Sequence, residues 1–267
     1  MASPKPSVSD RLADAAFGAA PQLWPLPTAG SARERWLRAV AAGGQGHYGA
    51  AFHELDEIIR TGPPGPTHSL AYSTRASFLR QLGGHDQARG WDGRAWLLAG
   101  DDPEAGVDAL VGLAADALGV GRLAASARLL QRARELLACP APPRLPVRLR
   151  WVAAELAMAG GDGTAAVAHA QNAVMLADKL GSIRHTVKSQ VVLSAALCCA
   201  GRLDDAREVA DAAFAETDRF ALIPLRWALG CLLADIGSTT HSAPQVAAVR
   251  DAAADTVRRG GGVWSRR

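Results

Sequence analysis

The residues of this chain that could form a metal site or act as nucleophiles are seven histidines and four cysteines. His47 and His53 stand six positions apart, which places them on different faces of a helix, and no cysteine pair has CxxC spacing. Residues 160–164 have the glycine content of a phosphate-binding loop but lack the lysine that such a loop needs. We therefore expect no catalytic residue, no metal, no cofactor and no enzymatic activity.

The compartment is predicted from the cysteines and from the apolar runs. Because the cysteines are not arranged in pairs, we expect Cys139, Cys198, Cys199 and Cys231 to be small buried residues in a reducing compartment. Residues 1–30 lack the basic start and continuous apolar core of a signal peptide. No apolar run approaches the roughly 18 residues that span a bilayer. These features predict a cytoplasmic protein without a membrane partner.

The charge is distributed unevenly. The formal net charge is +3, and the last twelve residues contain four arginines and no acid, so the rest of the chain is nearly balanced. A protein that reads nucleic acid usually carries its basic residues on a folded face. The charge pattern therefore does not favour a nucleic-acid partner.

Glycines recur at a nearly fixed interval along the chain. They are Gly46, Gly83, Gly121, Gly161, Gly201 and Gly237, at spacings of 37, 38, 40, 40 and 36 residues. A small residue follows each of the first five after five positions: Ala51, Ala88, Ser126, Ala166 and Ala206. A short turn between antiparallel helices needs the conformational freedom of glycine, and a close helix crossing needs small side chains. The interval predicts stacked helix–turn–helix units.

Residues 82–88 and 200–206 carry this pattern most clearly, and they resemble the tetratricopeptide-repeat family. The units of that family pair two helices, with a glycine before the second helix and alanines at these places. The resemblance implies an all-α fold, a right-handed superhelical solenoid of about six antiparallel helix pairs. It covers residues 31–221 and extends with a weaker pattern to residue 259.

Two segments flank the predicted repeat domain of residues 31–259. Residues 1–30 are expected to form a flexible arm with one short capping helix at about residues 10–19, and a recruited peptide motif is the alternative interpretation of that helix. Residues 260–267 are expected to form a basic tail, with residues 263–267 loosely held.

In a solenoid of this kind the first helix of each pair lines the concave side. Ten positions before the six glycines stand Trp36, Ser73, Val111, Trp151, Val191 and Trp227. Tryptophan contributes a large contact area at low entropic cost, which suits a binding surface. Filling gaps between alanine-rich helices is the alternative role, and the sequence favours neither.

Charged residues at neighbouring offsets complete the predicted groove. It consists of Trp36, Arg33, Arg80, Val111, Arg148, Trp151, Glu155, Lys188, Val191 and Trp227. An apolar floor with a basic edge suits a peptide or an amphipathic helix, including acidic segments.

These features predict a protein–protein interaction module, an adaptor or regulator whose groove binds a segment of a partner protein. The alternative is a transcription-associated regulator that contacts nucleic acid or the transcription machinery, because similar solenoids accompany DNA-binding domains in bacterial activators. A sensor of small molecules ranks below both.

Overall fold

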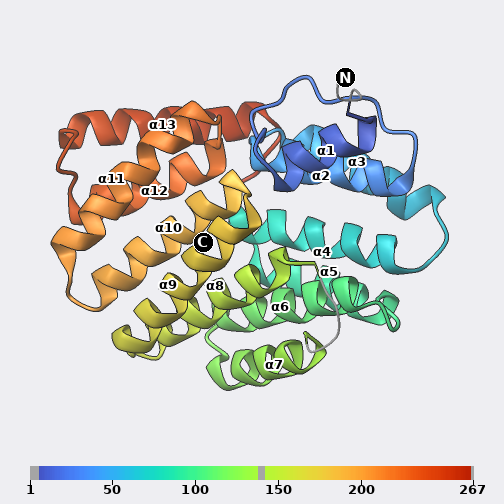
Figure 1. Ribbon diagram of the computed structural model, residues 1–267, viewed down its shortest axis with the longest axis horizontal. Coiled ribbons are helices and arrows are strands. Elements are labelled where there is room, and N and C mark those ends of the chain that lie inside the picture. Colours follow the sequence, from blue (N-terminus) through green and yellow to red (C-terminus); the bar gives the residue numbers. More distant parts are fainter. Residues whose placement is uncertain (1–5, 138–141, 266–267) are drawn as a thin grey trace, which may run out of the picture.

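A computed structural model describes residues 6–137 and 142–265, which form 13 α-helices and no strand (Figure 1). The helices are α1 (Val8–Phe17), α2 (Ala32–Gly44), α3 (Tyr48–Thr61), α4 (Pro66–Gln81), α5 (His85–Leu98), α6 (Pro103–Gly119), α7 (Leu123–Leu136), α8 (Arg144–Ala159), α9 (Gly163–Leu180), α10 (Ile183–Cys199), α11 (Leu203–Arg219), α12 (Ile223–Ile236) and α13 (Ala243–Arg259). The predicted all-α class is confirmed.

The six predicted glycines all lie between consecutive helices. Their φ angles are positive, between 74° and 89°, a backbone conformation that other residues rarely adopt. The small residues five positions after the first five glycines are completely buried, at 0% exposure. A side chain with no more than one or two heavy atoms lets the neighbouring helix approach closely at each of these positions. The glycine interval therefore located the turns correctly.

The helices form two layers. Each of α2, α4, α6, α8, α10 and α12 contacts the next member of this series as well as its neighbours in sequence. We call these six helices the inner layer, and α3, α5, α7, α9, α11 and α13 the outer layer. Consecutive helices that pack on one another in this way are compatible with a helical repeat.

The first helix of the chain covers one end of the inner layer. A capping box between Ser7 and Asp10 begins α1, and Leu12, Ala15 and Ala16 are buried against α2. The helix also reaches α10, because the N–H of Ile183 donates to the carbonyl of Gly18 at 3.2 Å. Residues 1–5 of the predicted arm lie outside the described part of the chain.

The two ends of the chain meet. Figure 1 shows α13, in red, beside the blue N-terminal helices, and the N–H of Gly49 donates to the carbonyl of Gly260 at 2.6 Å. A Cβ on Gly261 would lie 2.8 Å from the nitrogen of Gly49, so glycine is required for this approach.

The prediction that residues 263–267 are loosely held is wrong for Trp264 and Ser265. The N–H of Ser265 donates to the carbonyl of Leu82 at 2.8 Å, and the rings of Trp264 and Trp227 lie 4.2 Å apart. The glycine-rich turn after α13 brings the apolar Trp264 back onto the helices, where it is partly buried. Residues 266 and 267 are outside the described chain.

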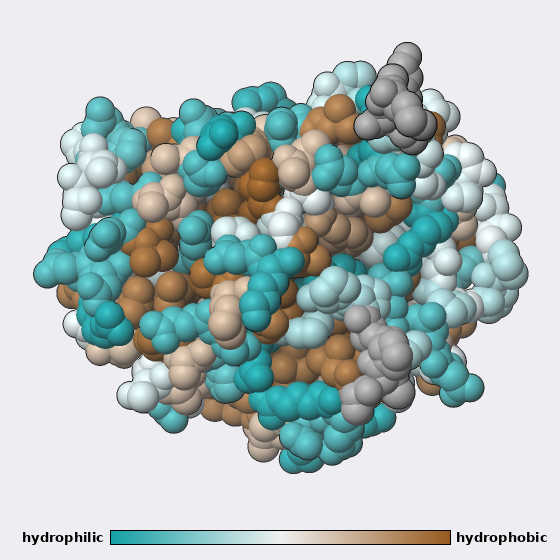
Figure 2. Space-filling model, in the orientation of Figure 1, coloured by the Kyte–Doolittle hydropathy of each residue, from teal (hydrophilic) through white to brown (hydrophobic). Residues whose placement is uncertain are grey.

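The surface and the cysteines add two findings. Hydrophilic residues cover much of the face in Figure 2, and apolar residues show between them in several separate places. The predicted burial of the cysteines is wrong for Cys199, which is exposed, while Cys198 and Cys231 are half-buried. Cys139 lies outside the described residues.

None of the described helices has the length and apolar character needed to cross a bilayer.

Candidate ligand-binding cavity

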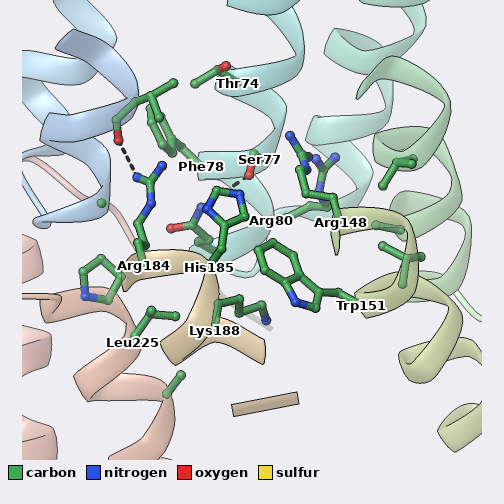
Figure 3. A pocket seen from close by; sticks show the side chains of 18 of the residues that line it. Thr74, Ser77, Phe78, Arg80, Arg148, Trp151, Arg184, His185, Lys188 and Leu225 are labelled. Atoms are coloured by element: carbon green, nitrogen blue, oxygen red, sulfur yellow. Dashed lines mark hydrogen bonds between the residues drawn. The ribbon is translucent and has the colours of Figure 1, made fainter. Parts of the chain in front are cut away.

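A cavity of about 420 Å³ lies within the inner layer, and part of its wall is shown in Figure 3. Every helix of the inner layer contributes residues to its wall, which also includes Phe17 of α1, Tyr48 of α3, His85 of α5 and Trp264 of the tail. Pockets that bind small ligands have volumes of about 300–1,000 Å³. The cavity therefore has the size of a ligand site.

Eight of the ten residues of the predicted groove line this one cavity: Trp36, Arg80, Val111, Arg148, Trp151, Glu155, Lys188 and Trp227. Arg33 and Val191 do not belong to its wall. Arg33 forms an ion pair with Glu104 at 3.0 Å and lies over the ring of Trp36. Val191 packs against the apolar cluster between α11 and α12.

The three predicted tryptophans of the wall differ in exposure. Trp36 is only 1% exposed, and its Nε1–H donates to Oγ1 of Thr74 at 2.9 Å. Trp151 and Trp227 are half-buried, with one face toward the cavity. The indole of Trp36 thus forms part of the core as well as the wall, whereas the other two can offer contact area to a ligand.

Arg80 lies on a buried pair of carboxylates. Its Nη1 donates to Oδ1 of Asp116 at 2.9 Å and to Oδ2 of Asp92, and neither aspartate is exposed. Burial raises the pKa of both carboxyl groups, that of Asp92 to about 7, although Arg80 acts in the opposite direction. The second oxygens of the two carboxyl groups, Oδ1 of Asp92 and Oδ2 of Asp116, have no hydrogen-bond partner among the described residues.

Arg144 and Arg148 of α8 share Asp108 of α6. Nη2 of Arg144 lies 2.6 Å from Oδ2 of Asp108 and 2.9 Å from Oε1 of Glu104, and Arg148 bonds the other oxygen of Asp108. Burial favours the neutral form of Asp108, but the two guanidinium groups outweigh burial and lower its pKa. These two arginines therefore have carboxylate partners behind the cavity wall.

Arg184 of α10 has partners of another kind. Its Nη1 donates to the carbonyl of Val40 at 2.7 Å, and its Nη2 donates to the carbonyl of Ala16 at 2.6 Å. Burial, together with the positive charges of Arg148 and Arg144, lowers the pKa of Arg184 to about 10. Arg184 remains protonated at neutral pH and connects α10 to both α1 and α2.

His185 stands beside Arg184 and points into the cavity (Figure 3). Its ring stacks on Trp151 at 5.3 Å, and Nδ1 lies 2.8 Å from Oγ of Ser182. Burial and the arginines nearby lower the pKa of His185 well below its usual value. The imidazole is therefore neutral at physiological pH and adds an aromatic face to the wall.

Sequence reasoning missed several wall residues, and only some had a signal. Arg144 and Arg184 stand seventeen positions before their glycines, one helical turn before the predicted Arg148 and Lys188. A search for charged residues one turn closer to the N-terminus of each helix would have identified both arginines. Phe17 and Trp264 belong to no repeat, so the glycine interval contained no signal for them.

The wall combines aromatic faces with guanidinium donors, which bind apolar and anionic parts of ligands respectively. Within residues 6–137 and 142–265, no group of three or more histidine, cysteine, aspartate or glutamate residues is placed to hold a metal ion. The sequence matches no protein-family model and no curated protein.

Proposed function

We propose that this protein is a non-enzymatic regulatory or adaptor module of the cytoplasm, which binds a short segment of a partner protein in the cavity. We further propose that its helices form six antiparallel pairs of a right-handed, tetratricopeptide-like solenoid. The observation that carries the proposal is that eight residues of the predicted groove, on all six inner helices, line one cavity.

The volume of the cavity favours an extended segment over a helix. An α-helix with its side chains is about 10–12 Å wide, so 420 Å³ would hold roughly one turn. A few residues in extended form fit without separation of the inner helices. Of the two predicted ligands, peptide or amphipathic helix, the geometry thus supports the peptide.

A small organic ligand is the second candidate, because the same volume lies within the range of small-molecule pockets. Such a ligand would make the protein a sensor. The two candidates share the cavity and differ in the chemistry of what enters it.

The proposal is tested by incubation of the immobilised protein with a library of peptides of three to five residues. Bound peptides are identified by mass spectrometry and their affinities measured by calorimetry. We expect Trp151→Ala to lower the affinity for the selected peptides at least about tenfold. Trp151 is half-buried, and tryptophans often contribute most of the free energy of binding at such sites. Trp24→Ala is the matched control, because Trp24 is 48% exposed and stacks on His47 outside the cavity wall.

Retention of affinity in Trp24→Ala and loss in Trp151→Ala would support the cavity as the binding site. Equal affinity of both variants, or no peptide bound above background, would overturn the proposal. Circular dichroism of each variant shows whether the helical content is intact.

A further inference from the structure

Three neighbouring inner helices carry charged residues at equivalent positions. Seventeen and thirteen positions before their turn glycines, α6 has Glu104 and Asp108, α8 has Arg144 and Arg148, and α10 has Arg184 and Lys188. The members of each pair are four residues apart and therefore lie on one helix face. The six residues thus form a charged stripe, acidic on α6 and basic on α8 and α10, of which the four basic residues line the cavity.

The acidic pair neutralises the first basic pair only. Asp108 bonds both arginines of α8, and Glu104 divides its charge between Arg144 and Arg33. No carboxylate among the described residues forms an ion pair with Arg184. Lys188 faces Glu155 at 3.6 Å, a long contact between half-buried side chains. The α10 end of the stripe therefore has an excess of positive charge.

Arg184 also has unused hydrogen-bond capacity. A guanidinium group has five N–H donors, and two hydrogen bonds from Arg184 go to main-chain carbonyls. A carbonyl carries only a partial negative charge, so it does not neutralise the cation as a carboxylate would. The neighbouring Arg144 and Arg148 lower the pKa of Arg184 further, as expected where positive charges gather without an anion.

Apolar side chains also line this end of the cavity, beside Glu155 and His185. Trp151, Leu225 and Trp227 belong to the same wall, and the ammonium group of Lys188 lies 5.9 Å from the ring of Trp151 (Figure 3). A ligand with an apolar body and one anionic group would match both parts of the surface. A charge-assisted bond to a guanidinium is stronger than a neutral hydrogen bond.

We propose that Arg184 and Lys188 form an anion-binding subsite, which takes a carboxylate or phosphate group of a ligand whose apolar part lies against Trp151 and Trp227. This inference rests on the proposed function in one respect, namely that the cavity takes a ligand. The anionic group belongs either to the C-terminus of a peptide or to a small organic acid.

The test compares matched ligands on the unaltered protein. The probes are N-acetylated tripeptides of apolar residues with a free C-terminal carboxylate, the same tripeptides as C-terminal amides, and hexanoate, hexyl phosphate and hexanol. Calorimetry gives the affinity of each. We expect the acid of a pair to bind about ten- to a hundredfold more tightly than its neutral counterpart, as a charge-assisted hydrogen bond provides.

The outcomes separate the two proposals. Preference for peptide acids supports both of them. Preference for hexanoate or hexyl phosphate over hexanol, with no peptide bound, supports the anion subsite and overturns the peptide function. Equal binding of peptide acids and amides overturns the subsite and leaves the peptide function standing. Absence of binding by every probe overturns both.

Substitutions at Lys188 and Arg184 then test whether these two residues form the subsite. Lys188→Met should reduce the ratio of acid to amide affinity without loss of structure, since Lys188 makes one long ion pair with Glu155 and lies 5.9 Å from the ring of Trp151. In Arg184→Met the peptide acid and its amide should bind with equal affinity. Arg128→Met is the matched control, because Arg128 is exposed on α7 of the outer layer. An unchanged ratio in both Lys188→Met and Arg184→Met would overturn the assignment.

Discussion

Arg80 and Arg184 line the same cavity, but the protein holds them in opposite ways. Arg80 bonds two carboxylates that are inaccessible to solvent, whereas Arg184 bonds two main-chain carbonyls. A buried cation that has its own anions is part of the structure, because removal of either partner leaves an unpaired charge. A cation with only partial charges around it can still accept an anion from outside. The difference separates structural arginines from binding arginines in this cavity.

The largest expected effect in this comparison is that of Arg80→Met. The substitution leaves Asp92 and Asp116 buried without a cation, and we expect the free energy of unfolding to fall by about 3–5 kcal/mol. Urea denaturation followed by circular dichroism measures it. The double variant with Asp116→Asn should recover part of the loss, since one buried carboxylate is then removed. A loss below about 1 kcal/mol would show that Arg80 is not held as the structure indicates.

The second prediction concerns pH. The pKa of Asp92 is about 7 in the folded protein and about 4 in an unfolded chain. Between these values the folded protein holds a proton that the unfolded chain releases. The contribution of Asp92 to stability is therefore complete below about pH 4 and is lost as the pH rises through about 7, by at most about 1.4 kcal/mol per pH unit.

Urea denaturation from pH 5 to pH 8 checks this sign. The stability of the unaltered protein, relative to Asp92→Asn, should fall as the pH rises, because asparagine does not titrate. His185 contributes in the opposite direction, since its lowered pKa costs stability when the pH falls below about 6.5, but it is common to both proteins and cancels. A difference independent of pH would rule out a raised pKa of Asp92 in the folded protein.

Arg184→Met should have a smaller effect than Arg80→Met. The variant loses two hydrogen bonds from a charged donor but leaves no buried carboxylate unpaired, so we expect a loss of about 1–3 kcal/mol. Hydrogen exchange should increase in α1 and α2, whose carbonyls Arg184 binds, and stay unchanged in α5 and α6. A loss as large as that of Arg80→Met would remove the distinction between the two arginines.

The repeat part of this structure was accessible from the sequence because it depends on short-range constraints. A turn that needs a positive φ selects glycine, and a close crossing selects alanine, so Gly201 and Ala206 identify a helix pair without knowledge of its neighbours. The same register brought eight of ten predicted residues to one cavity. The wall of the cavity follows from the repeat.

The closure of the chain could not be predicted in this way. Contacts of the N-terminal helices with distant parts of the chain, such as Gly49 with Gly260 and Arg184 with Ala16, have no period. Trp264 follows a run of glycines, and local sequence patterns of this kind predict a flexible tail. The ion pairs of Arg80 also could not be predicted, because they depend on which helices pack against one another.

The smallest expected effect on stability is that of Trp264→Ala, which concerns the closed end of the chain. Trp264 is only partly buried against Trp227, so we expect a loss of about 1 kcal/mol, below the 3–5 kcal/mol of a fully buried tryptophan. Because the tail contacts α3 and the end of α4, hydrogen exchange should increase near Tyr48 and Leu82 and stay unchanged around Asp92 and Asp116.

Trp24→Ala is the control, since that indole is about half exposed and stacks on His47 away from the cavity. If hydrogen-exchange protection falls around Asp116 as strongly as around Tyr48, the Arg80 region also depends on the contact between the two chain ends. Hydrogen-exchange protection lost only near Tyr48 and Leu82 would show that the carboxylates under Arg80 are held by the repeat, independently of the contact between the chain ends.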